Sequence, residues 1–194
     1  MHDVYHEHVD TYYGWQSKTN WKYLPGSNEF LWVSERSNWA QIYLYDLTTG
    51  KEKGQITHGD GPVYDILYVD QKSRVIYFES VDKEKGENPY YVHLYRVDFD
   101  GKNQKLLTPE DANHVVTLSP DASTFVDVYS TIDTPQTAVL RDNNGKLITT
   151  LGKQDISALT ATGWKPPTET TKLASSCSTA THSLMSARPL RLVQ

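Results

Sequence analysis

The chain has 194 residues, of which 38% are hydrophobic, and this length and composition suit one good-sized folded domain and exclude global disorder. The formal net charge of −5 offers no basic surface for phosphate, so nucleic acid is not an expected partner. The single cysteine, Cys177, excludes an intramolecular disulfide and a cysteine-rich zinc site. No apolar run approaches a membrane span, and the first residues lack the pattern of a signal peptide.

Taken in chain order, the sequence predicts a lead-in segment or partial blade over residues 1–19 and then three units of four short strands. The first unit, 20–58, contains the strands EFLWVSE and QIYLYDL. The second, 59–110, contains RVIYFES and YVHLYRVDF around the longer hairpin VDKEKGENPYY. The third, 111–155, contains HVVTL, TFVDVYS, QTAVLRD and KLITTL, with an Asn-Gly turn that accommodates positive φ. No stretch of comparable length has the periodicity of an amphipathic helix.

The first unit repeats in the third without a gap. Phe30 falls on Phe125 and Gly50 on Gly145, an offset of 95 residues in both cases. Four-stranded antiparallel units recurring roughly every 40 to 50 residues are typical of β-propeller blades, whereas a β-sandwich needs no near-copies. We therefore expect an all-β fold, a β-propeller fragment of about three four-stranded antiparallel blades. Because a closed ring takes about four to eight blades, the open ends of such a fragment favour self-association.

Three stretches carry a family resemblance: FLWVSERSNWAQIYLYDLTTGK, TPEDANHVVTLSPDASTFVDVYSTIDTP and ATGWKPP. Over about residues 20–167 they resemble the C-terminal part of the β-propeller domain in the dipeptidyl peptidase IV family of prolyl-oligopeptidase-type serine peptidases. TolB-like propellers share the general blade pattern. A non-enzymatic propeller of that kind, used as a protein-binding scaffold, is the alternative interpretation.

The resemblance implies a parent protein in which the propeller caps an α/β-hydrolase domain, restricts access to the cavity between the domains and helps to bind peptide substrates. The implied reaction removes dipeptides from peptide N termini without a cofactor, using a serine in a G-x-S-x-G elbow. This sequence contains no G-x-S-x-G, so no catalytic residue is assigned and the chain alone is expected to be inactive. Residues 156–167 are expected to form the exit linker toward the hydrolase domain. A periplasmic or extracellular parent is compatible with the resemblance.

Residues 168–194 depart from the family pattern. They include no glycine, aspartate or aromatic residue and are rich in serine and threonine. Such a segment buries too little apolar surface to offset the entropy lost on ordering. We expect a disordered tail or one that is read out of frame.

The first unit contains the most chemically suggestive residues. Glu35, Arg36 and Trp39 lie where a blade hairpin turns, and an Arg–carboxylate pair there can hold a peptide or fasten neighbouring blades, with fastening favoured. Ser34 and Ser37 have no histidine base nearby in the sequence. Serines in such turns are expected to bond the local backbone instead of acting as nucleophiles.

Other candidate residues lie outside that hairpin. Tyr13 and Trp15 are expected to line a substrate cavity or to pack in a core. Asp127 interrupts an apolar strand, so its carboxylate must face a central channel or bond across blades. His6 and His8 share one side of an extended segment, as two metal ligands can, but a terminal segment rarely fixes the required geometry, and no metal is expected.

Overall fold

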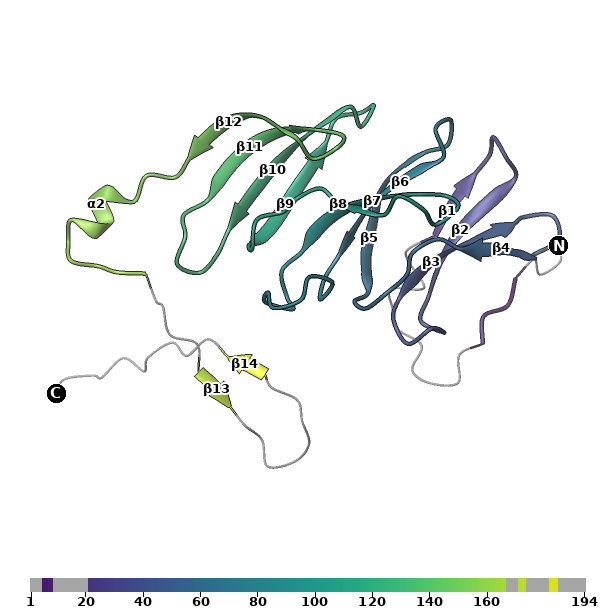
Figure 1. Cartoon of the computed structure of the whole chain (residues 1–194), viewed down its shortest axis with the longest axis horizontal. Coiled ribbons are helices and arrows are strands. Elements are labelled where there is room, and N and C mark those ends of the chain that lie inside the picture. Colours follow the sequence, from purple (N-terminus) through teal and green to yellow (C-terminus); the bar gives the residue numbers. More distant parts are fainter. Residues whose placement is uncertain (1–4, 9–20, 167–170, 174–181, 185–194) are drawn as a thin grey trace.

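The computed structural model describes residues 5–8, 21–166, 171–173 and 182–184, and Figure 1 shows three β-sheets side by side in a row. Each has four antiparallel strands in sequence order. The first sheet contains β1 (Trp21–Leu24), β2 (Glu29–Ser34), β3 (Gln41–Asp46) and β4 (Glu52–Gln55). The second sheet contains β5 (Val63–Asp70), β6 (Val75–Ser80), β7 (His93–Asp98) and β8 (Lys105–Leu106). The third sheet contains β9 (Asn113–Leu118), β10 (Thr124–Ser130), β11 (Thr137–Asp142) and β12 (Leu147–Lys153). The predicted all-β fold with three four-stranded antiparallel units is confirmed.

The strands form because apolar and aromatic side chains alternate between the two faces of each sheet, and the faces that meet between neighbouring sheets are covered. In β2, Leu31 and Val33 point toward the second sheet, where they join a core with Ile76 and Phe78. The intervening residues Phe30 and Trp32 point to the opposite face of the first sheet. Each sheet therefore has two packing faces, as expected for a blade within a stack.

A second core joins the second and third sheets. Val75, Tyr77 and Leu94 of the second sheet pack against Phe125 and Ala122 of the third. The repeat places Phe30 at the position of Phe125. That face of the blade meets the preceding sheet in the third sheet, whereas in the first sheet it packs against Tyr5. The stacking thus has a direction along the chain.

The outermost strands of the three sheets differ in length. β4 has four residues and β8 has two, whereas β12 has seven, all of them exposed. The pairing of β11 with β12 shifts register at two places, next to Val139 and next to Leu140, which marks two bulges. β12 is therefore long but irregular.

A short helix, α2 (Ser157–Thr160), follows the third sheet inside the predicted exit linker. Within the tail that was expected to lack order, the described residues form the strands β13 (Thr171–Leu173) and β14 (His182–Leu184), which pair antiparallel. No helix in the described ranges has the length and apolar character needed to cross a membrane.

Candidate functional site

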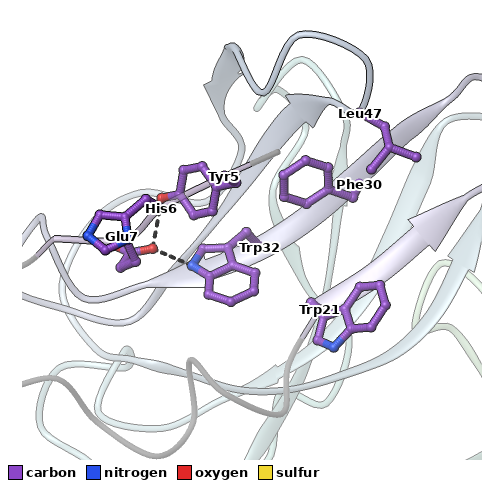
Figure 2. A pocket seen from close by; sticks show the side chains of 7 residues that line it. All are labelled: Tyr5, His6, Glu7, Trp21, Phe30, Trp32 and Leu47. Atoms are coloured by element: carbon purple, nitrogen blue, oxygen red, sulfur yellow. Dashed lines mark hydrogen bonds between the residues drawn. The ribbon is translucent and has the colours of Figure 1, made fainter. Parts of the chain in front are cut away.

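An aromatic cavity of about 570 Å³ lies on the outer face of the first sheet, away from the second sheet. Its lining comes from the segment 5–8 and from the first sheet with the turn that follows β3 (Figure 2): Tyr5, His6, Glu7, Trp21, Phe30, Trp32 and Leu47. The rings supply a mainly apolar wall, and Glu7 supplies a carboxylate at its edge. This combination suits an apolar group and gives no arrangement of nucleophile and base.

Hydrogen bonds from the sheet hold Glu7 in place. Its carboxylate accepts bonds from Ser34 Oγ at 2.6 Å, from Tyr5 Oη at 2.8 Å and from Trp32 Nε1. The ring of Tyr5 packs on Tyr45 with centroids 4.5 Å apart. Burial, helped by its hydrogen bonds to Tyr45 and Glu7, raises the pKa of Tyr5, so its phenol stays neutral. The segment 5–8 is thus fastened to the outer face of the first sheet.

Arg36 extends over the same face. Its guanidinium lies 3.7 Å from the centroid of the Tyr43 ring and donates hydrogen bonds to Tyr45 Oη at 2.7 Å and to Glu52 at 2.6 Å. The structure therefore places Arg36 in one network with Tyr5 through the shared Tyr45 hydroxyl, which lies 3.0 Å from Tyr5 Oη. These partners lie in β3 and β4 of its own sheet, so the contacts stabilise the first sheet and do not reach the second.

The hairpin around Arg36 has the local geometry of a turn. Ser34 Oγ accepts a hydrogen bond from the Arg36 N–H at 3.3 Å, and Asn38 adopts a positive φ of 78°. Glu35 and Trp39 flank this turn, as predicted. Tyr13 and Trp15 lie outside the described residues.

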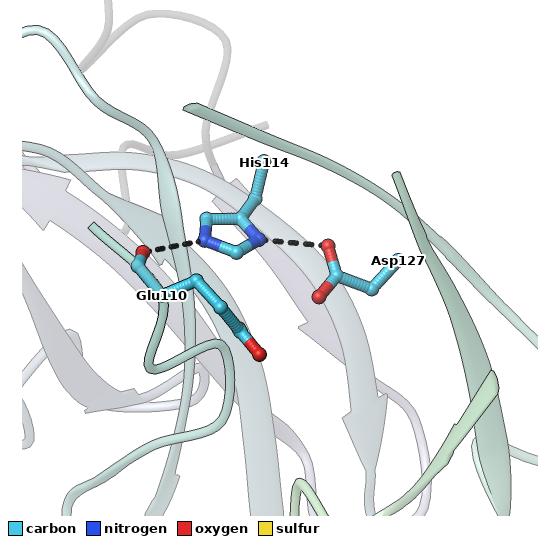
Figure 3. Close-up of side chains that lie close together, drawn as sticks. All are labelled: Glu110, His114 and Asp127. Atoms are coloured by element: carbon cyan, nitrogen blue, oxygen red, sulfur yellow. Dashed lines mark hydrogen bonds and ion pairs between the residues drawn. The ribbon is translucent and has the colours of Figure 1, made fainter. Parts of the chain in front are cut away.

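Asp127 is fully buried, and both predictions for it were wrong. Its carboxylate neither faces a channel nor bonds to another blade, because its partners come from the neighbouring strands of its own sheet. Oδ1 lies 2.8 Å from His114 Nδ1 in β9, and Oδ2 accepts a bond from Arg141 Nε in β11 at 3.1 Å. Arg141 also pairs with Glu110, which precedes β9. Figure 3 shows His114 held between Asp127 and the Glu110 carbonyl oxygen.

This cluster is the arrangement in the described residues that comes nearest to a metal site. Glu110, His114 and Asp127 offer ligand atoms within 4.8 Å of one another. Arg141 already binds both carboxylates, however, and its guanidinium fills the role that a metal cation would have. In the segment 5–8, His6 and His8 are exposed while the intervening Glu7 bonds to the sheet.

The second sheet contains a carboxylate pair that was not predicted from the sequence. Asp65 in β5 lies directly opposite Glu79 in β6. Burial, together with the negative charge of Asp65, raises the pKa of Glu79 to about 7. The alternation of side chains along a strand could have predicted the sheet face on which each carboxylate lies. Their position opposite each other depends on the register of β5 with β6, which shifts at a bulge beside Asp65 and cannot be read from the sequence.

Known proteins match this chain in sequence and in structure. The family profile described as Dipeptidyl peptidase IV (DPP IV) N-terminal region matches residues 2–136. The dipeptidyl peptidase 4 of Arthroderma otae is 37% identical over 86 residues, which are 44% of this chain and 10% of the relative. The probable dipeptidyl peptidase 4 of Aspergillus flavus is 26% identical over 121 residues, 61% of this chain and 15% of the relative. The matches thus span only a small part of these relatives.

Two solved structures share the fold. The Porphyromonas gingivalis dipeptidyl peptidase 4 superimposes with a TM-score of 0.68 at 24% identity, covering 87% of this chain and 23% of that one. A putative dipeptidyl aminopeptidase IV from Bacteroides ovatus gives a TM-score of 0.62 at 22% identity, covering 82% and 24%. Because the family profile matches well over half of its residues, the chain belongs to the dipeptidyl peptidase IV N-terminal region family.

Proposed function

We propose that this chain is the C-terminal part of the propeller in a dipeptidyl-peptidase-IV-like serine peptidase, where it gates the catalytic cavity and helps to bind peptide substrates. The family match over residues 2–136 carries the proposal. In this arrangement 20–58, 59–110 and 111–155 are successive blades, and 156–167 leads toward an α/β-hydrolase domain. The chain alone has no peptidase activity.

The direction of stacking leaves a place for a further blade before the first sheet. Phe125 packs on the preceding sheet, whereas its equivalent Phe30 lies beside the aromatic cavity. A further blade before the first sheet would cover Phe30 and Trp32 as the second sheet covers Phe125. The cavity is then a seat for a neighbouring blade, and peptide binding falls to the loops at the ends of the blades.

A chimera tests the proposal. Residues 21–166 replace the structurally aligned segment of the Porphyromonas gingivalis dipeptidyl peptidase 4, and turnover of a chromogenic Xaa-Pro substrate is measured. We expect the chimera to cleave the substrate, a deletion of the same segment to be inactive, and the chain alone to show only background. A chimera that folds, as judged by circular dichroism, but has no turnover contradicts the proposal. So does activity of the isolated chain that a serine-directed inhibitor abolishes.

The same chimera tests whether Arg36 fastens the blade. Because Arg36 stacks on Tyr43 and bonds to Tyr45, Arg36→Ala should lower the free energy of unfolding by about 1–2 kcal/mol and leave KM unchanged. Glu52→Gln is the control, since an exposed ion pair contributes about 0–1 kcal/mol. A raised KM with unchanged stability would instead assign Arg36 to peptide binding.

A further inference from the structure

The two ends of the row of sheets present the same kinds of face that meet inside it. Each sheet has a leading face, turned toward the preceding sheet, and a trailing face, turned toward the following one. At the ends of the row (Figure 1), no other four-stranded sheet in the described ranges packs on the leading face of the first sheet or on the trailing face of the third. This leading face includes Trp21, Phe30, Trp32 and Leu47, and this trailing face includes Val115, Val126, Val128 and Leu140.

The three sheets can be aligned residue by residue. Asp46, Asp98 and Asp142 are the last residues of β3, β7 and β11, and each lies opposite the first residue of the strand before it. Counting from these pairs gives the equivalent positions in the three sheets. The two junctions inside the chain therefore show what covers each kind of face.

The trailing face of the third sheet repeats the face through which the first sheet packs on the second. Leu31 and Val33 of the first sheet are fully buried there, in a core that includes Ile76 and Phe78. The equivalent positions of the third sheet are also apolar but are partly exposed: Val126 and Val128. Val115, opposite Val128, is 62% exposed. The third sheet thus carries the side chains of a blade junction without the sheet that covers them.

The leading face of the first sheet repeats the face through which the second sheet packs on the first. Trp32 is equivalent to Phe78, which is fully buried at that junction. Trp21, opposite Trp32, is equivalent to Ile66, and the exposed fractions of these two side chains are 52% and 1%. The segment 5–8 covers part of this face, and the remainder surrounds the aromatic cavity (Figure 2).

The charges near these two faces allow them to meet. At the junction of the first and second sheets, Glu29 at the start of β2 pairs with Arg74, which precedes β6. The equivalent residues that would meet in a contact of the third sheet with the first are Thr124 and Asn28, and both are neutral. Glu7, at the edge of the cavity, already accepts three hydrogen bonds. The contact therefore buries apolar surface without separating an ion pair at this position.

We propose that the chain by itself associates head to tail, with the trailing face of the third sheet of one copy packed on the leading face of the first sheet of another. Stacks of repeats normally end in polar outer faces, whereas both end faces here are largely apolar. Two different faces of each copy take part, so the contact is heterologous and further copies can add at either end. In the parent protein proposed above, other blades would occupy these faces. The inference concerns the chain alone and does not depend on that proposal.

Two variants of the full chain, each with one face blocked, test this pairing by sedimentation velocity. Val115→Lys places a charge on the trailing face, and Trp21→Lys places one on the leading face. Both side chains are exposed, so the fold should be kept, which circular dichroism checks. We expect the unmodified chain to form species that lengthen with concentration and each variant alone to be a monomer. An equimolar mixture of the variants should form a pair with twice the monomer mass and no larger species.

The double variant that carries both substitutions is the matched control, and it should form no complex with either single variant. Self-pairing of Val115→Lys would show contact between two leading faces, and self-pairing of Trp21→Lys contact between two trailing faces. Either result overturns the proposal, as does a mixture without the paired species or an unmodified chain that stays monomeric. If a variant does not fold, Val128→Lys or Tyr23→Lys on the same face replaces it.

Discussion

At the scale of single residues, buried carboxylates show how charge links the sheets. Glu29 in β2 is 1% exposed and pairs with Lys53 of its own sheet and with Arg74 from the turn that precedes β6. Burial by itself would raise the pKa of Glu29, but hydrogen bonds from Arg74, Lys53 and Ser27 outweigh it and lower the pKa to about 2. The ion pair therefore joins the first and second sheets.

Glu29→Gln should reveal this link through its pH dependence. Because the pKa of Glu29 falls from 4.5 to about 2 on folding, its stabilisation is complete above about pH 4.5 and is lost as the pH falls toward 2. At pH 7 the variant should lose about 2 kcal/mol of unfolding free energy. Urea titrations should show the gap closing between pH 4.5 and 2, and exposed Asp111→Asn serves as the control. A gap that stays constant down to pH 2 contradicts the assignment.

The pH dependence of stability at Glu79 runs in the opposite direction to that at Glu29. The pKa of Glu79 is higher in the folded chain, about 7 against 4.5, so the folded state loses stability as the pH rises from 4.5 to 7. Glu79→Gln should therefore be about 1 kcal/mol more stable than the unmodified chain at pH 8, after allowance for solvent screening, and equal to it at pH 4. Asp65→Asn is the matched variant, because removing the facing charge should lower the pKa of Glu79. A Glu79→Gln chain that is no more stable at pH 8 would be the contrary result.

At the scale of elements, turn glycines fix how closely neighbouring blades approach. Gly145, in the turn between β11 and β12, has a φ of 81°, and a Cβ added there would lie 2.7 Å from the Leu107 carbonyl oxygen. Leu107 follows β8 in the second sheet, so the turn presses directly on the neighbouring blade. An Asn-Gly turn was expected here from the sequence, but the contact with Leu107 was not.

Gly145→Ala should cost about 1–3 kcal/mol of unfolding free energy, because the new methyl group meets backbone and the residue must keep a left-handed conformation. Gly152→Ala is the matched control in the adjacent strand, since a Cβ there has nothing within 4 Å. We expect Gly152→Ala to change the urea midpoint little. Equal losses in the two variants would show that strand propensity, and not the close approach, sets the effect.

The elements also show what the sequence could predict. Alternating apolar residues and Gly-containing turns located the strands, because that signal is local. The partners of Asp127 could not be predicted from the sequence, because His114 and Arg141 lie 13 and 14 residues away and contact it only through the register of the sheet. The packing of Tyr5 on Tyr45, 40 residues apart, likewise depends on tertiary contacts.

At the scale of the whole molecule, the stack of sheets is open at its far end. On the free face of the third sheet, Val115 lies opposite Val128 and Val126 opposite Leu140, and Val115 is 62% exposed. This face corresponds to the one through which the first and second sheets pack on the sheet that follows. An apolar surface of this kind favours association with another copy or with a further blade.

Val115→Lys should therefore reduce self-association of the isolated chain, because a charge on the open face must be desolvated on contact. Sedimentation velocity over a range of concentrations measures the change. Leu151→Lys, on the exposed edge strand β12, is the comparison variant. We expect the weight-average sedimentation coefficient to fall toward that of a monomer for Val115→Lys only. A compact monomer in the unmodified chain would contradict the expectation.

The two bulges in β12 limit the ways in which copies of the chain can associate. An edge strand with Leu147, Ile148 and Leu151 half exposed and its only charge at the end, on Lys153, would ordinarily be a template for fibril growth by backbone pairing. The register shifts interrupt the regular spacing of donors and acceptors that an incoming strand needs. Contacts between copies are thus directed to side chains on the open faces, and aggregates of this chain should be amorphous and reversible by dilution instead of amyloid.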